Sequence, residues 1–251
     1  MVRLGRRVLA AALCFCCFGL VGAPEAIARK SKPAVRYDGD SDRFASARYA
    51  ALDAASCHAE LSRRGIAFSA EHDAQYKGVL APVRVRDRIS GVLFRTTASE
   101  SERQTTPYEV FDCRLVLSLS DWSRLLLSKD IDEVLFFSAF RPPPKPHAED
   151  KAASRHPGGL AIDVFRFGKR KKSPTETREW IDIERDFQGR LKQPVCPQAP
   201  SSGANSKRNP KTNTKILRGL VCETAEMHLF SSILTPNYDR AHKNHLHLEI
   251  V

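Results

Sequence analysis

The strongest constraint on this chain comes from two short stretches of metal-ligand side chains that lie far apart in the sequence. Residues 154–163 contain His156 and Asp163 with Pro-Gly-Gly between them, and residues 242–247 contain three histidines. Pro and Gly are poor helix formers, so we expect a turn between His156 and Asp163. Such a turn would fold the imidazole back onto the carboxylate.

Both stretches continue into segments with the pattern of a strand. Residues 160–165 form a short, mostly apolar run, and residues 244–251 alternate polar and apolar side chains with a period of two. That period is typical of a half-buried strand. It predicts that His245, His247 and Glu249 share one face.

His156, Asp163 and one C-terminal imidazole make a three-ligand set for a zinc ion. Three protein ligands leave a fourth position for water, which is typical of a catalytic zinc site. Zinc held by His156, Asp163 and His247 would polarise a scissile carbonyl group and lower the pKa of water to roughly 7. Hydrolysis also needs a proton acceptor and a proton donor. His245 and His242 are the candidates, because they precede His247 on the same stretch.

Arg141 is the candidate for stabilising negative charge on the substrate. It ends the apolar run 133–141, which predicts a buried strand because three prolines follow it. An arginine here could stabilise the oxyanion of a tetrahedral intermediate. The alternative is a surface arginine that pairs with an acidic neighbour.

The remaining periodicity predicts helices around a small sheet. Segments with helical spacing or amphipathic character are residues 49–62, 115–127, 180–187 and 223–234. Ser120 and Asp121, which lie within residues 115–127, are the expected cap of the helix in that segment. Residues 78–86 and 91–95 predict a hairpin, because a short polar turn joins two strand-like runs. We therefore expect an α+β fold with a small central antiparallel sheet that carries the zinc site and is flanked by helices.

The N-terminal residues 1–28 have the features of a secretory signal peptide. Three arginines precede an apolar run over residues 8–23, and a small-x-small cleavage site follows at 26–28. The run is short for a membrane span, so we expect no stable span after cleavage. Residues 29–47 are polar and charged, which predicts a disordered linker. Residues 48–251 are then expected to form a single domain.

Three of the seven cysteines lie in the predicted signal peptide, which leaves an even number in the exported chain. An even number in an exported protein predicts two disulfides, with three possible pairings. We prefer Cys57 with Cys113 and Cys196 with Cys222, because the second bond would close the polar loop between its cysteines. A zinc site made of cysteines is the weaker alternative, since the thiols lie away from the histidines in the sequence.

The chain is strongly basic, with a formal net charge of +11 at pH 7, and stays basic after removal of the signal peptide. An exported protein of this charge is expected to meet anionic cell-envelope polymers rather than nucleic acid. No nucleic-acid motif accompanies the charge.

At these residues the sequence resembles the zinc peptidases of the lysostaphin, D-Ala-D-Ala carboxypeptidase and hedgehog type. The pattern Ser-x-His-x-x-Gly-x-Ala-Ile-Asp over residues 154–163 is similar to the first motif of the carboxypeptidases, and Ser-Ala-Phe-Arg at 138–141 to their upstream Ser-Gly-Tyr-Arg. His-x-x-His-x-His at 242–247 is similar to the triple-histidine motif of the penicillin-insensitive murein endopeptidases. From about residue 50 to residue 251, the order of features most resembles the bacterial extensin-like C-terminal domain.

This resemblance implies a hedgehog or D-Ala-D-Ala peptidase-like fold with one Zn²⁺ ion. Its implied residue roles are His156, Asp163 and His247 as zinc ligands, His245 as catalytic histidine, and Arg141 as substrate or oxyanion partner. The carboxypeptidases place a glutamate base shortly before the last ligand, whereas Asn244 and His245 stand there in this chain. A histidine-based mechanism is therefore favoured.

The expected function is that of an exported zinc metallopeptidase, in the periplasm or outside the cell. It would hydrolyse peptide stems or crosslinks of peptidoglycan, as an endopeptidase or a carboxypeptidase. The alternative is a non-catalytic, zinc-stabilised module of the same fold that binds the cell wall. The choice between a D,D and an L,D bond stays open, because pocket shape set by distant loops decides it.

Overall fold

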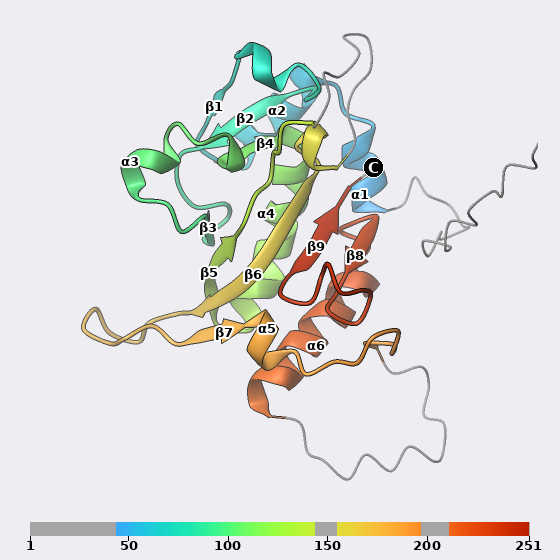
Figure 1. Ribbon diagram of the computed structural model, residues 1–251. Coiled ribbons are helices and arrows are strands. Elements are labelled where there is room, and N and C mark those ends of the chain that lie inside the picture. Colours follow the sequence, from blue (N-terminus) through green and yellow to red (C-terminus); the bar gives the residue numbers. More distant parts are fainter. Residues whose placement is uncertain (1–43, 144–154, 197–210, 251) are drawn as a thin grey trace, which may run out of the picture. The chain divides into compact units, whose positions relative to one another are not determined.

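The computed structural model describes residues 44–143, 155–196 and 211–250. They form a mixed structure of helices and mostly antiparallel sheets (Figure 1). This agrees with the predicted α+β class. No helix in the described part of the chain combines the length and apolarity that crossing a membrane requires.

The predicted N-terminal segments fall mainly outside these residues. The signal peptide, residues 1–28, lies wholly outside them, as does most of the linker predicted for residues 29–47. Helix α1 begins at Ala45, slightly before the domain boundary predicted at Arg48. The last residues assigned to the linker therefore belong to the first helix.

The chain alternates between helices and strands for most of its described length. The α-helices are α1 (Ala45–Ala50), α2 (Ala54–Arg63), α3 (Glu100–Arg103), α4 (Cys113–Ser128), α5 (Ile183–Asp186) and α6 (Thr212–Glu226). The 3-10 helices are η2 (Ala74–Tyr76), η3 (Pro107–Glu109) and η4 (His156–Gly158). The strands are β1 (Phe68–Ala70), β2 (Pro82–Val85), β3 (Leu93–Arg95), β4 (Val110–Asp112), β5 (Ile131–Phe136), β6 (Ala161–Lys169), β7 (Trp180–Asp182), β8 (Ser232–Leu234) and β9 (Leu246–Glu249).

The larger sheet has six strands in the order β3-β5-β6-β9-β8, with β7 added beside β6. Its pairs are antiparallel except β3 with β5, which is parallel. The predicted antiparallel sheet therefore has one parallel pair, at this edge. The reason is the connection: β4 and α4 lie between β3 and β5 in the chain, and a helical crossover joins parallel strands.

The smaller sheet joins β1, β2 and β4 in antiparallel pairs. The predicted hairpin between residues 78–86 and 91–95 is wrong, because β2 belongs to this sheet and β3 to the larger one. Between the two runs only Ile89 and Val92 form a bridge. Both side chains are fully buried in the main core, so the chain turns inward between the sheets.

Helix α4 is the centre of the hydrophobic core and is buried on most of its surface. It begins at Cys113 with Asp112 as its cap, and not at the predicted Ser120 and Asp121. The Asp112 side chain accepts hydrogen bonds from the backbone N–H and the guanidinium of Arg114. These bonds hold the cap in place, whereas Ser120 and Asp121 lie inside the helix and accept hydrogen bonds from Arg64.

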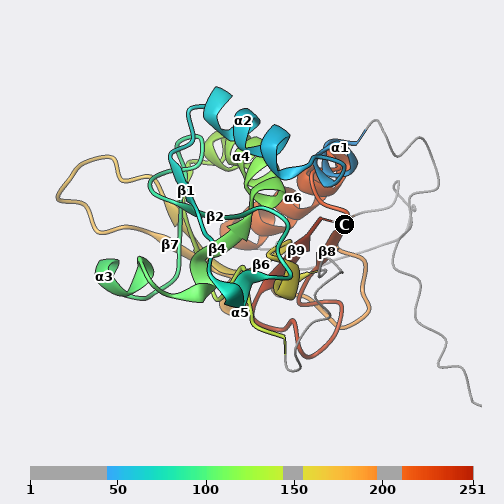
Figure 2. The ribbon, with the colours of Figure 1, turned by 90° about the horizontal axis from the view of Figure 1, so that it is seen from above.

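Trp122 of α4 connects the larger sheet with α6. Its ring contacts Phe94 of β3, Phe167 of β6 and Phe230. Its indole N–H donates a hydrogen bond to Thr224 Oγ1 of α6 at 2.8 Å. The view from above shows α4 and α6 together on one side of β6, β9 and β8 (Figure 2). Strand side chains that point away from α4 and α6 lie on the opposite face of this sheet.

Two of the predicted helical segments contain strands. Residues 180–187 form β7 and then the single turn of α5. The helix predicted over 223–234 begins earlier, at Thr212, and ends at Glu226, and residues 232–234 form β8. Pairing of β7 with β6 and of β8 with β9 overrides the local helical spacing.

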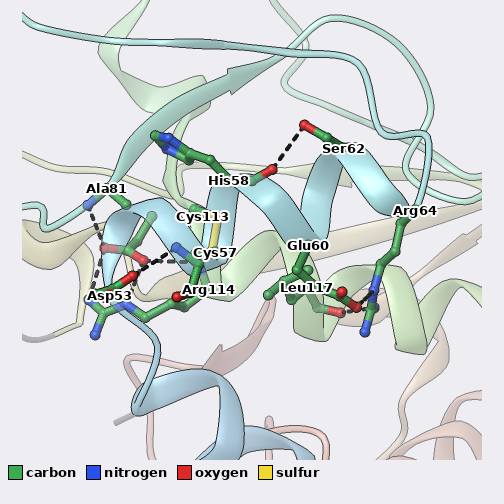
Figure 3. The surroundings of a disulfide bond; sticks show 12 residues. Asp53, Cys57, His58, Glu60, Ser62, Arg64, Ala81, Cys113, Arg114 and Leu117 are labelled. Atoms are coloured by element: carbon green, nitrogen blue, oxygen red, sulfur yellow. Dashed lines mark hydrogen bonds and ion pairs between the residues drawn. A yellow bond between two sulfur atoms is a disulfide. The ribbon is translucent and has the colours of Figure 1, made fainter.

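The two disulfides are the preferred pairs. Cys57 of α2 is joined to Cys113 at the start of α4, with Cα atoms 6.0 Å apart (Figure 3). Cys196 is joined to Cys222 of α6, with Cα atoms 5.5 Å apart. Because these cysteines are all in disulfides, they are not available for the alternative cysteine zinc site.

The turn after His156 rests on the start of α4. Gly159 has a φ of +64°, a left-handed conformation that favours glycine. A Cβ atom at this position would lie 2.7 Å from the backbone nitrogen of Asp112, which donates a hydrogen bond to the Gly159 carbonyl. The close approach of two backbones therefore requires glycine here.

We predict that Gly159→Ala destabilises the fold and weakens metal binding, because the methyl group must push η4 away from α4. Gly65→Ala is the matched control, since Gly65 has a φ of +68° but open space around it. The left-handed backbone alone should cost roughly 1–2 kcal/mol in either variant, and overpacking should add at least about 1 kcal/mol at Gly159. Urea unfolding of both variants measures the difference. Equal losses would contradict the close contact.

Candidate metal centre

The three predicted metal ligands meet on the open face of the larger sheet. Asp163 of β6 and His247 of β9 are direct partners in the antiparallel register. Their neighbours Ile162 and Leu248 lie in the core, so the alternation of a strand directs Asp163 and His247 to the other face. The turn η4 brings His156 to the same place. All three ligand side chains are buried.

The ligand atoms of these residues lie close together. His156 Nε2 is 3.1 Å from Asp163 Oδ1 and 3.2 Å from His247 Nδ1. His247 Nδ1 is 2.8 Å from Asp163 Oδ1. The group could hold a metal ion, because each residue offers one ligand atom and these atoms all lie within 4.8 Å of one another.

The second nitrogen of each imidazole has its own partner. His156 Nδ1 donates to the carbonyl oxygen of Ala139 at 2.8 Å. His247 Nε2 donates to Glu249 Oε2 at 2.9 Å. These bonds fix the orientation of each ring and leave His156 Nε2 and His247 Nδ1 to face Asp163. Glu249 is thus the carboxylate behind a candidate metal ligand, His247.

Asp163 and His247 shift each other's pKa. Burial raises the pKa of Asp163, but hydrogen bonds from His156 and His247 outweigh burial and hold it well below its usual range. Burial lowers the pKa of His247, but hydrogen bonds to Asp163 and Glu249 raise it to about 9. Without a metal, a protonated His247 therefore sits between two carboxylates at neutral pH. A bound metal ion would supply the positive charge in place of that proton.

The spacing and chemistry of the donors fit a metal that prefers imidazole. Zinc bonds of about 2.0–2.2 Å place tetrahedral ligands roughly 3.3–3.5 Å apart. The observed separations of 2.8–3.2 Å need only a small expansion to reach that value. Two imidazoles and one carboxylate suit zinc or iron(II) better than magnesium or calcium.

His245 lies beside the ligands. Its Nε2 is 3.6 Å from Asp163 Oδ1, and its Nδ1 donates to Asn244 Oδ1 at 2.9 Å. Burial lowers the pKa of His245 and outweighs the opposing charge of Asp163. The imidazole is therefore neutral at pH 7, with the Nε2 lone pair available to accept a proton.

His242 and Arg141 complete the set predicted from the sequence. The His242 ring lies 5.1 Å from the His245 ring and 5.8 Å from the His247 ring, measured between centroids, and its Nδ1 is 2.7 Å from Asp239 Oδ1. Arg141 follows β5 in a loop, where its backbone N–H donates to the His156 carbonyl. Its Nη2 is 3.2 Å from Asp163 Oδ2. Arg141 thus pairs with an acidic neighbour, as the alternative interpretation expected, but that neighbour is a candidate metal ligand.

The ligands open onto a cleft of about 470 Å³, which is also lined by Arg141, Arg155, His242 and His245. Arg155 is one functional candidate that sequence reasoning missed, and Glu249 is another. The alternating pattern of residues 244–251 placed Glu249 on the face of His247, and this could have indicated its role. Nothing in the sequence indicated that Arg155 lies close to Glu249.

Comparison of the chain with family models, curated proteins and solved structures gives no match.

We predict that removal of bound metal lowers the melting temperature. A ligand that binds only the folded state at about 100 times its Kd stabilises that state by roughly 2.7 kcal/mol. Melting curves with zinc, with a chelator, and with zinc restored measure this shift. Asp163→Asn should show little response to zinc because it lacks the charged ligand. A full zinc response of that variant would show that Asp163 is not a ligand.

We predict that Glu249→Gln weakens zinc binding about 10- to 100-fold, the usual effect of removing a carboxylate behind a ligand histidine. Asp239→Asn is the matched control, because Asp239 bonds to His242 rather than to a ligand. Competition with a chromogenic chelator measures both affinities. Equal affinities of the two variants would show that Glu249 does not support His247.

Proposed function

We propose that this chain is an exported zinc metallopeptidase that hydrolyses peptide stems or crosslinks of peptidoglycan. The observation that carries the proposal is the arrangement of His156, Asp163 and His247 on an open cleft, with a neutral His245 and the Arg141 guanidinium beside them. This combination offers a metal, a proton acceptor and a stabiliser of negative charge at one place. Those are the components that amide hydrolysis requires.

Export is supported by two features of different origin. The two disulfides are compatible with an oxidising compartment outside the cytoplasm. The N-terminal segment has the pattern of a signal peptide. The chain stays basic without that segment, which suits contact with anionic wall polymers. The resemblance of residues 154–163 to the D-Ala-D-Ala carboxypeptidases and of residues 242–247 to the murein endopeptidases supplies the choice of peptidoglycan as substrate.

Zinc bound by His156, Asp163 and His247 would supply a Lewis acid for the scissile carbonyl group and make water more acidic. His245 accepts a proton through Nε2 from the water that attacks the carbonyl carbon. Arg141 donates hydrogen bonds to the carbonyl oxygen as negative charge develops there.

When the C–N bond breaks, the leaving amine needs a proton. His245 can return the one it accepted, and His242 is the second candidate because Asp239 holds its ring close to that of His245.

A histidine base is favoured because neither carboxylate at the metal site is free to accept a proton. Asp163 is the only acid among the described residues that line it, and as a metal ligand it is not free to accept a proton. Glu249 is engaged with His247. Within the described residues the glutamate of the carboxypeptidases therefore has no counterpart, and His245 takes its place in the proposal.

We predict that zinc-loaded wild-type protein releases products from purified muropeptides and that His245→Ala lowers kcat about 100-fold or more while zinc still binds. His247→Ala should lose both zinc and turnover. His72→Ala is the control, because His72 is exposed outside the cleft. Product release is followed by chromatography of crosslinked and uncrosslinked substrates.

The possible negative results have different meanings. If the zinc-loaded wild type turns over neither substrate but binds them, the peptidase proposal is wrong and the non-catalytic wall-binding module takes its place. If the protein has no zinc affinity, both zinc proposals fail. If His245→Ala keeps full turnover, another group accepts the proton.

A further inference from the structure

A second arginine stands at the cleft beside the residues of the proposed reaction. The Arg155 side chain is 67% exposed, and its Nε lies 3.3 Å from Glu249 Oε2. The same oxygen of Glu249 accepts the hydrogen bond from His247. Arg155 therefore lies on the His247 side of the ligand group, whereas Arg141 pairs with Asp163.

The backbone holds Arg155 at this place. Its φ is +56° and its ψ is −140°, an uncommon conformation for a residue other than glycine. Its carbonyl oxygen accepts hydrogen bonds from the N–H groups of Gly158 and Leu160, at 3.1 and 2.8 Å. Strained residues persist where the surrounding structure fixes them, and they cluster at functional sites. The turn that positions His156 therefore also fixes the backbone position from which the Arg155 side chain extends.

The Arg155 guanidinium has N–H donors that can bind a further partner. Within residues 44–143, 155–196 and 211–250, its only ion pair is the one through Nε with Glu249, and it makes no side-chain hydrogen bond there. Arginine has N–H donors in a planar fork, which matches the two oxygens of a carboxylate. The exposed Arg155 guanidinium, which pairs with Glu249 only through Nε, can therefore donate its other N–H groups to a carboxylate ligand.

The charge balance of the cleft favours an anion. Asp163 and Glu249 would balance a bound divalent metal ion, and Arg141 and Arg155 would then leave an excess of positive charge. Asp239, which pairs with His242, offsets part of it. A carboxylate on the substrate would complete the balance, and in the proposed peptidoglycan stem the C-terminal residue carries one.

We propose that Arg155 is a specificity residue that binds a substrate carboxylate next to the scissile bond, namely the free C-terminal carboxylate of a peptide stem. The proposal rests on the proposed peptidase function and deepens it by naming the substrate class. It assigns the two arginines different tasks: Arg141 acts at the reacting carbonyl, and Arg155 recognises the end of the chain. Stems with a free carboxylate are then preferred over amidated stems and over crosslinks that lack a carboxylate at that position.

The test measures binding rather than turnover. Calorimetry with zinc-loaded protein in a His245→Ala background uses diacetyl-Lys-D-Ala-D-Ala as the free acid and as the C-terminal amide. The background should bind the acid about 10- to 100-fold more tightly, because a charged hydrogen bond distinguishes the two. Arg155→Gln should remove this preference, and Arg155→Lys should keep part of it. Arg185→Gln is the matched control, since Arg185 is 63% exposed, pairs with an acid and lies outside the cleft.

Each other outcome overturns the inference. Equal binding of acid and amide, or no binding of either, shows that no carboxylate is recognised. An unchanged preference in Arg155→Gln shows that another group recognises it. An equal loss for acid and amide together with weaker zinc binding shows that Arg155 only supports Glu249.

Failure of the proposed function has a different signature. If the wild type never hydrolyses muropeptides but prefers the free acid through Arg155, the peptidase proposal fails and carboxylate recognition stands. If the wild type hydrolyses free and amidated stems equally well with or without Arg155, only the carboxylate inference fails.

Discussion

The contact between Asp163 and His247 is the interaction on which the site depends. A buried carboxylate is costly unless it is paired, and Asp163 is 3% exposed. Its oxygens contact His156, His247 and Arg141, which come from a turn, a strand and a loop. Because Asp163 and His247 are partners in register, a slip by one residue would turn His247 into the core and remove its hydrogen bond to the carboxylate. The register of β6 and β9 therefore determines whether Asp163 and His247 can meet, and their hydrogen bond in turn favours that register.

The start of α4 holds the turn that carries His156 in place. Asp112 caps the helix, ends β4 and donates its backbone N–H to Gly159 in the turn beside His156. Cys113, the next residue, is bonded to Cys57 of α2. One end of the central helix thus joins the smaller sheet, a disulfide and the turn that carries the candidate metal ligand His156. Such support matters because sites need their side chains held within a fraction of an ångström.

The errors of sequence interpretation share one cause. The patterns of residues 160–165 and 244–251 identified strands correctly, because the period of two is a local property. The hairpin after residue 78 and the helix over 223–234 failed because the partner of a strand is not encoded locally. The cap of α4 was misplaced for a similar reason, since Asp112 also accepts a hydrogen bond from the backbone N–H of Ala81, which is distant in the sequence.

The sequence by itself determined the donor set His156, Asp163 and His247, the α+β class and the expectation of two disulfides, because residue type, spacing and cysteine number are properties of the chain. It left three pairings of the four cysteines open, and the tertiary structure decided among them because pairing depends on which segments lie close together. Only the tertiary structure decided that Glu249 lies behind His247 and that Arg155 shares its carboxylate. It also decided that the pKa of His245 is lowered by burial and that the pKa of His247 is raised by its carboxylate partners. Hydrogen-bond partners and pKa values depend on distances of a few ångströms and on burial, and these arise only when segments far apart in the chain pack together.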